Sequence, residues 1–188
     1  MSRILQLRVT LIKVKPATWR VLLVPENMTF KELHEALLHA FEWSGYHHWQ
    51  FHFRKRIIGP PDEDGLDVDL GLGDYTEADQ ITLDDLKLKE KNTFKYLYHF
   101  DDDWQAKCQV EAIHEPEEGQ VYPWCLEGEG NNPVEDYGGP EVYTEIVRIL
   151  KNPRHAEYED SVEILGADYD AKFFDKDSLN DYFAGKES

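Results

Sequence analysis

The chain has 188 residues, of which 41% are hydrophobic and 13% aromatic, and these are values of a globular protein. Its 38 acidic and 20 basic side chains give a formal net charge of −18, which disfavours direct binding to DNA or RNA because such binding depends on Lys and Arg neutralising phosphates. Cys108 and Cys125 are too few for a disulfide framework or a zinc knuckle. Neither a signal-peptide core nor an apolar run of the ~20 residues that a membrane span needs is found, so we expect a cytoplasmic protein outside the membrane.

The first predicted elements are two strands and a helix. Residues 4–14 alternate apolar and polar side chains with the period of a half-buried strand, and a second strand follows at 19–24. The short link between them predicts an antiparallel hairpin. Thr29 and Glu32 have the spacing of a capping box, which predicts a helix that runs to about residue 42 and packs on the hairpin.

A third strand is predicted at residues 49–54, where period two returns. Residues 57–86 contain ten acidic residues and no Lys or Arg, and they predict a long exposed excursion with one helical turn near 81–86, capped by Thr82.

An alternating aromatic run then leads into three consecutive aspartates. Phe94, Tyr96, Tyr98 and Phe100 are expected on one face of a strand, and a second alternating stretch begins at Trp104. Asp101–Asp103 would form the turn of a β-hairpin. The order of elements predicts an α+β fold, in which one helix crosses a face of a mixed β-sheet in a β-grasp-like arrangement.

The last third of the chain predicts a long loop and C-terminal helices. Residues 115–140 are rich in Pro, Gly and acids, and a helix is expected from Gly139-Pro140 to the Asn152-Pro153 pair. Shorter helices are predicted near 154–165 and near 175–184, the second capped by Asp175. No linker interrupts the pattern, so residues 1–188 are predicted to form a single domain.

Four segments in this order resemble a known family. They are Pro-Ala-Thr-Trp-Arg at 16–20, the helix from Leu33-His34 to Trp43 and His47, Tyr-x-Tyr-x-Phe-x-Asp-Asp-Trp at 96–104, and residues 123–143 with Pro-x-Glu-Asp-x-Gly-Gly. From about residue 3 to 183 the chain resembles the plasmid ORF-three-like family, named after an open reading frame of an Ri plasmid. The resemblance implies an α+β fold similar to the β-grasp and an association with plasmids and mobile elements, and it implies no particular biochemical activity.

The chain departs from the family's pattern at several positions. The usual strand-end motif has Asp, Gly and His where this chain has His99, Asp101 and Ala106. Two cysteines of the later segment are replaced by Asn132 and Tyr137. The resemblance therefore does not predict a metal or catalytic role that needs those groups.

The first hypothesis about function is a binding or accessory module. The aspartate turn and the loop at 135–139 would line one acidic, aromatic-rimmed cleft for a basic peptide or another cationic ligand, and thus for a protein or peptide partner. A structural role for the same residues is the alternative, with aspartates forming the turn and Trp104 in the core. The candidate ligand-binding residues are Asp102, Asp103, Trp104, Glu135, Asp136, Tyr143 and His47.

The second hypothesis is a metal-dependent hydrolase or other enzyme. It would use the carboxylates of Asp102, Asp103, Glu135 and Asp136, and His99 and Cys125 are also possible ligand types. No tight ligand motif is present, so the sequence assigns no metal ligand and no cofactor. The Gly-x-Gly segments at 71–73 and 128–130 lack the partners of a phosphate loop and are expected to be loop glycines.

Overall fold

The fold of residues 2–61 and 74–186, which the computed structural model describes, is a mixed sheet with helices. The strand order is β5-β4-β3-β6-β7-β1-β2-β8, in which β4 and β5 run parallel and the other described neighbours are antiparallel. The strands are β1 (Ile4–Leu11), β2 (Trp19–Pro25), β3 (Trp49–Phe53), β4 (Arg56–Gly59), β5 (Asp74–Glu77), β6 (Thr93–Tyr98), β7 (Trp104–His114) and β8 (Trp124–Glu129). The helices are α1 (Phe30–Phe41), α3 (Gly139–Ile149), α4 (Tyr158–Leu165) and α5 (Lys176–Phe183). The predicted α+β class is confirmed, whereas the β-grasp likeness and the single domain stay predictions.

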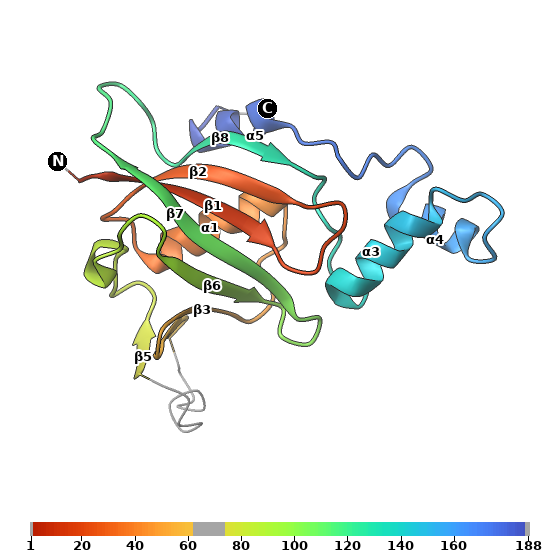
Figure 1. The fold of residues 1–188 in the computed structure, drawn as a ribbon, viewed down its shortest axis with the longest axis horizontal. Helices are drawn as coiled ribbons and strands as arrows, with labels where there is room; N and C mark the ends of the chain where they lie inside the picture. The colour runs from red at the N-terminus through yellow and green to blue at the C-terminus, as the bar shows by residue number, and fades with distance from the viewer. Residues whose placement is uncertain (1, 62–73, 187–188) are drawn as a thin grey trace.

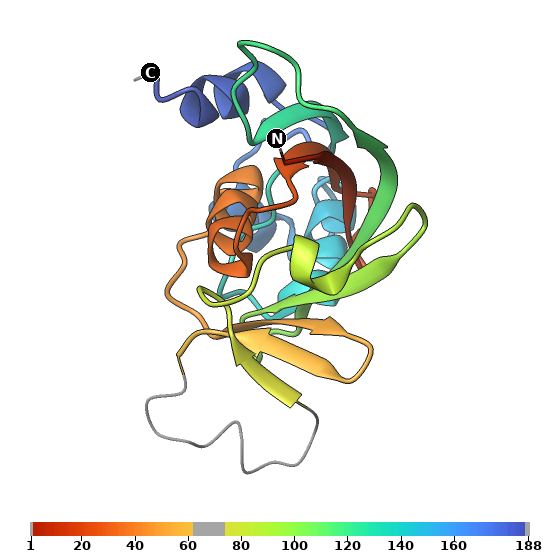
Figure 2. The same ribbon diagram turned by 90° about the vertical axis from the view of Figure 1, so that its left-hand side faces the viewer.

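Helix α1 lies in the hollow of the curved sheet, as Figure 2 shows. Its predicted capping box is confirmed: the Glu32 N–H donates to Thr29 Oγ1 at 3.2 Å, and the Thr29 N–H donates to Glu32 Oε2 at 2.7 Å. Phe30, Leu33 and Leu37 are fully buried, and burying each of these side chains contributes about 2 kcal/mol. The apolar stripe of α1 therefore closes the core between helix and sheet.

The predicted hairpins are both confirmed. Strands β1 and β2 pair with Leu7 opposite Leu22, and β6 and β7 pair with Tyr98 opposite Trp104. The prediction for Phe100 is wrong, because this residue lies in the turn beyond β6 and its side chain is 44% exposed. The turn of this second hairpin lies at the end of the sheet where α3 begins (Figure 1).

The prediction of one exposed excursion over 57–86 is wrong for the described residues. Strands β4 and β5 lie here, and apolar residues among the acids, such as Ile58 and Leu83, are fully buried. The expected helical turn is present as a 3₁₀ helix at Asp84–Leu86. Thr82 does not cap it as an acceptor, since its N–H and hydroxyl both donate to Asp85 Oδ2. The glycines expected in a loop at 71–73 fall outside the described residues.

The prediction of a loop over 115–140 missed a strand. Residues 124–129 form β8 beside β2, so Gly128 is a strand residue. Helix α5 lies beside the outer edge of β8 (Figure 1). There Asn180 Oδ1 accepts from the Cys125 N–H at 2.7 Å, and Asn180 Nδ2 donates to the Cys125 carbonyl at 2.9 Å. One side chain therefore meets both backbone groups of a strand residue.

The three C-terminal helices are confirmed close to their predicted ranges. Pro140 lies in the first turn of α3, and Asp175 caps α5 by accepting from the Ser178 N–H at 3.0 Å. Helices α3 and α4 extend to one side of the sheet, away from α1 (Figure 1).

Arg20 on β2 is fully buried and fixes the segment that leads to α3. Its guanidinium donates to the Ala40 carbonyl at the end of α1 at 3.0 Å, to the carbonyls of Glu129 and Gly130 at 3.0 Å each, and to Asn132 Oδ1 at 2.7 Å. Burial lowers the pKa of this group to about 10, so it is positively charged at neutral pH. A single cation thus holds β2, α1 and residues 129–132 together.

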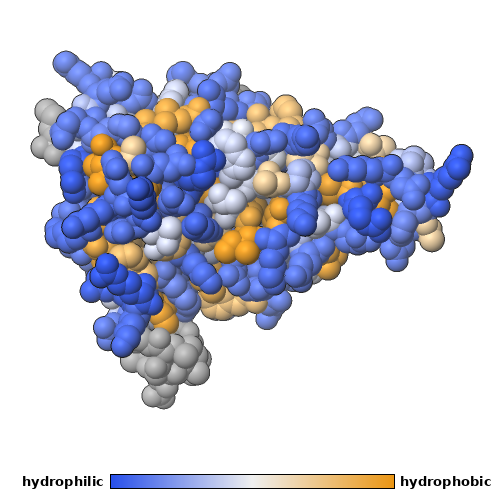
Figure 3. All heavy atoms as spheres, viewed as in Figure 1, coloured by the Kyte–Doolittle hydropathy of each residue, from blue (hydrophilic) through white to orange (hydrophobic). Residues whose placement is uncertain are grey.

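The face of the sheet opposite α1 carries polar side chains. Arg8 on β1 lies 4.2 Å from the centre of the Trp19 ring and pairs with Glu111 on the adjacent strand β7 and with Glu127 on β8, two strands away. Figure 3 shows a largely hydrophilic surface in this view, with smaller hydrophobic patches. No helix in the described part of the chain is both long and apolar enough to cross a membrane.

Candidate functional site

Three segments far apart in the sequence meet at the end of the β6–β7 hairpin. They are the loop after α1 (residues 42–48), the turn between β6 and β7 (residues 99–103) and the segment before α3 (residues 130–138). The turn is wider than the predicted aspartate triplet, because the N–H groups of Asp102 and Asp103 both donate to the His99 carbonyl, at 3.0 and 2.9 Å. His99 is therefore part of the turn rather than of the strand.

Asp102 joins this turn to α3. Its Oδ2 accepts from the Gly138 N–H at 3.2 Å, at the N-terminus of the helix, where a negative charge is favoured by the helix dipole. Gly139 has a φ of +80°, and a Cβ there would lie 2.0 Å from the Asp102 carbonyl oxygen. Gly139, the first residue of α3, therefore allows the turn to approach the helix closely.

Glu135 joins the segment before α3 to the loop after α1. Its carboxylate accepts from the Ser44 backbone N–H, from Ser44 Oγ at 3.0 Å and from the Tyr98 hydroxyl at 2.7 Å. The Gly45 N–H donates to the same hydroxyl at 2.9 Å. Burial, with a smaller contribution from the Glu135 hydrogen bond, raises the pKa of Tyr98 to about 12, so this hydroxyl is a donor at neutral pH.

Two histidines and one carboxylate form the centre of the site. We call this group, His47, His99 and Asp136, the histidine cluster. Asp136 Oδ1 lies 3.1 Å from His47 Nε2 and 2.8 Å from His99 Nε2. The two rings are stacked, with centroids 3.6 Å apart. The side chain of His99 is 9% exposed and that of Asp136 is 65% exposed, so the cluster opens to solvent on the aspartate side.

The structure brings together some of the residues that the sequence suggested and separates others. His47, Asp102, Glu135 and Asp136 lie at this junction. Asp103 lies at its edge, where it accepts from Gln105 Nε2 at 2.6 Å and lies 3.8 Å from Lys13 Nζ.

Trp104 and Tyr143 were expected to rim the cleft, and the structure places both in the core. Each is 1% exposed, and their rings contact each other with centroids 6.3 Å apart. The Tyr143 hydroxyl is hydrogen-bonded to the Tyr169 hydroxyl at 2.7 Å. Their burial follows from position, since Trp104 begins β7 on its core face and Tyr143 lies on the inner face of α3.

Three other aromatic residues are exposed, and each is next in sequence to a member of the histidine cluster. Tyr46 precedes His47, Phe100 follows His99 and Tyr137 follows Asp136. These residues are 92%, 44% and 47% exposed. These three residues were not among the predicted site residues because each belongs to a different loop. The signal in the sequence is an aromatic residue next to a His or Asp.

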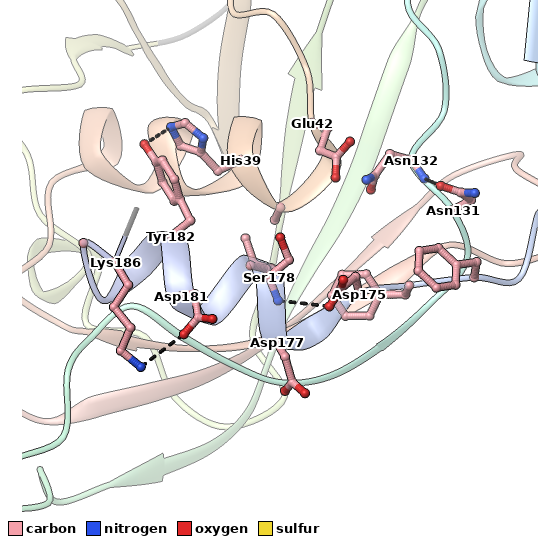
Figure 4. Close-up of a pocket in the computed structure, with 15 residues that line it drawn as sticks. His39, Glu42, Asn131, Asn132, Asp175, Asp177, Ser178, Asp181, Tyr182 and Lys186 are labelled. Carbon is pink, nitrogen blue, oxygen red and sulfur yellow. Dashed lines mark hydrogen bonds and ion pairs between the residues drawn. The ribbon is translucent and has the colours of Figure 1, made fainter. Parts of the chain in front are cut away.

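Two cavities of the described structure border this junction, and neither is lined by the histidine cluster. One of about 900 Å³ lies between α5 and the end of α1, where Figure 4 shows Glu42, Asn132, Ser178 and Tyr182 around it. Another of about 380 Å³ lies between α1 and β3, beside His34 and Trp49. Neither lining contains the aspartates of the turn or the acids of the 135–136 pair, so the expected cleft between them is not one of these cavities.

The two cysteines do not contribute a reactive group. Cys108 and Cys125 are both buried and unpaired. Burial raises the pKa of the Cys108 thiol strongly and that of Cys125 to about 11, which keeps both thiols protonated at neutral pH.

Comparisons with known proteins place the chain in a family. The model of the plasmid pRiA4b ORF-3-like protein matches residues 3–178. The chain is 33% identical over 182 residues to the uncharacterised protein y4hQ of Sinorhizobium fredii, covering 95% of this chain and 90% of that protein. It is also similar to the crystal structure of a protein of unknown function, MM3350 from Methanosarcina mazei Go1, with a TM-score of 0.82, 31% identity, and coverage of 95% of this chain and 98% of that chain. The chain therefore belongs to the plasmid pRiA4b ORF-3-like family.

Proposed function

We propose that this protein is an accessory binding module whose surface around the histidine cluster takes a basic peptide segment of a partner protein. The observation that supports it best is the aromatic rim, formed by Tyr46, Phe100 and Tyr137. These are three of the eight large hydrophobic side chains that are most exposed among the described residues, and each adjoins a member of the histidine cluster. Exposed aromatic side chains gathered at one place are typical of interaction surfaces.

The charge at the rim specifies a basic ligand. Asp101 is exposed in the same turn as Phe100, and Asp136, whose side chain is 65% exposed, precedes Tyr137. An Arg or Lys side chain gains attraction from an aromatic face and a charge-assisted hydrogen bond from a neighbouring carboxylate. The rim offers both kinds of contact within a few residues.

The metal-dependent hydrolase hypothesis through four carboxylates has weaker support. Asp102 accepts from the start of α3, Asp103 lies near Lys13, and Glu135 accepts from Ser44 and Tyr98. These three carboxylates therefore have structural partners, and binding by the rim is the better-supported function.

Fluorescence anisotropy with a labelled Arg/Gly peptide tests the proposal. The wild-type protein is expected to bind this peptide and not one in which Glu replaces Arg. Tyr46→Ala and Tyr137→Ala leave the net charge unchanged, and each should weaken binding by about fivefold, which corresponds to the ~1 kcal/mol of a cation–π contact.

The matched control is Phe173→Ala, because Phe173 is 56% exposed and lies by the cavity beside α5. This variant should bind the peptide like the wild type. A net charge of −18 attracts any basic peptide. Equal affinity for all three variants and the wild type would therefore mean that general electrostatic attraction accounts for binding, and it would refute the proposal that the aromatic rim binds the peptide.

A further inference from the structure

The histidine cluster has the ligand types and the spacing of a metal site. His47 Nε2, His99 Nε2 and a carboxylate oxygen of Asp136 all lie within 4.8 Å of one another. Imidazole nitrogen and carboxylate oxygen are the ligands that Zn²⁺ and related divalent ions take in proteins that lack a thiolate ligand at the site. The three residues come from three different segments, and none of them is part of a local ligand motif.

Two of the three distances between ligand atoms are close to those around a bound ion. Zn–N and Zn–O bonds of about 2.0–2.1 Å place two tetrahedral ligand atoms about 3.3 Å apart. Asp136 Oδ1 lies 3.1 Å from His47 Nε2 and 2.8 Å from His99 Nε2, so it needs to move outward by a few tenths of an ångström. Its side chain is 65% exposed and has room for this movement, whereas His99 is held in the turn.

Two further carboxylates lie just outside these three ligands. Asp102 Oδ2 is 3.6 Å from His99 Nε2, and Glu135 Oε2 is 3.4 Å from His47 Nε2. The side chains of Asp102 and Glu135 are only 15% and 11% exposed, and backbone or hydroxyl donors fix both. This partly buried negative charge favours a divalent cation and fixes the surroundings of the ligands.

We propose that His47, His99 and Asp136 bind one divalent transition-metal ion, such as Zn²⁺, with the exposed side of the site open to water or to a ligand. Three protein ligands and an open position distinguish such a site from a closed structural zinc site with four protein ligands. The assignment stands on the cluster itself and does not depend on peptide binding by the aromatic rim.

Isothermal titration of the full chain with Zn²⁺, after removal of metal with EDTA, tests the assignment. The wild type should bind one saturable equivalent, and X-ray absorption of the loaded protein should show two imidazole ligands. His47→Ala and Asp136→Asn should each weaken binding by at least about tenfold. Asp136 is exposed, so its variant is expected to fold even if a variant of buried His99 does not.

His114→Ala and Asp101→Asn are the matched controls, since both residues are exposed and outside the cluster. Both variants should bind Zn²⁺ like the wild type. The absence of a saturable equivalent, equal affinity in His47→Ala and Asp136→Asn, or an absorption spectrum without histidine ligands would each overturn the assignment. Peptide anisotropy repeated with EDTA keeps the two proposals apart: binding that persists without metal leaves the rim standing whatever the zinc result.

Discussion

The imidazole rings of His47 and His99 are stacked with centroids 3.6 Å apart, although one follows α1 and the other follows β6. Both Nε2 atoms reach the same oxygen of Asp136, from the segment before α3. The contacts among His47, His99 and Asp136 therefore depend on the relative positions of α1, the β6–β7 hairpin and the start of α3. A change in any one of these segments alters the geometry of the site.

The close approach of α3 to the turn makes Gly139 sensitive to substitution. Gly139→Ala should lower the free energy of unfolding by more than about 2 kcal/mol, because its Cβ would lie 2.0 Å from the Asp102 carbonyl oxygen. Gly119→Ala is the control: its φ is also +80°, yet no heavy atom lies within 4 Å of the added Cβ. It should cost about 1 kcal/mol. Urea unfolding measures both, and equal losses would contradict a steric role for the contact.

Asp102 is expected to act as a cap for α3. Asp102→Ala should cost about 1 kcal/mol, and Asp102→Asn less, because an amide oxygen can still accept from the Gly138 N–H. Hydrogen exchange should show faster exchange in the first turn of α3 in the alanine variant. Exposed Asp101→Ala serves as the control, and unchanged exchange in both variants would count against the cap.

The buried guanidinium of Arg20 should be among the most sensitive positions. Arg20→Met removes donors from buried carbonyls at the end of α1 and at residues 129–130, and we expect a loss of about 3 kcal/mol or more. Arg8→Met removes a partly exposed cation and should cost about 1 kcal/mol or less. Thermal unfolding compares the two, and similar losses would show that the buried hydrogen bonds of Arg20 matter little.

His34 predicts a pH dependence of stability. Burial lowers its pKa from 6.5 to about 3, so the unfolded chain binds more protons between these values. The free energy of unfolding should therefore fall as the pH decreases below about 6.5, by up to about 1.4 kcal/mol per pH unit from this group. Between about pH 7 and pH 5, His34→Gln should lose about 2 kcal/mol less than the wild type in urea unfolding. Parallel losses would assign the slope to other groups.

Local signals predicted most of the fold. Thr29 and Glu32 specify the start of α1 by direct hydrogen bonds, and alternation predicts β1, β3, β6 and β7 because their two faces differ. Strands β4, β5 and β8 were missed because each has only four to six residues. Their pairing is decided by neighbouring strands, and no period within four to six residues reveals it.

The site was predictable only in part, because its residues meet through the fold. The aspartate turn and the Glu135–Asp136 pair were visible as acidic clusters, and in the structure Asp102 and Asp136 both lie beside His99. Trp104 looked like a rim residue because it follows the aspartates, yet the alternation of β7 points it into the core. His99 contributes to the cluster only because two turn hydrogen bonds to its carbonyl position it there, which spacing alone does not show.

The hydrogen bonds between Asn180 and Cys125 extend the hydrogen bonding of the sheet to the C-terminal helix. A carboxamide offers one donor and one acceptor, as a peptide group does, so Asn180 occupies at Cys125 the place that a residue of another strand would take. Edge strands are where sheets recruit further strands from other molecules. Asn180 therefore satisfies the N–H and carbonyl of Cys125 with which a strand of another molecule would pair, and removing α5 would leave both groups free.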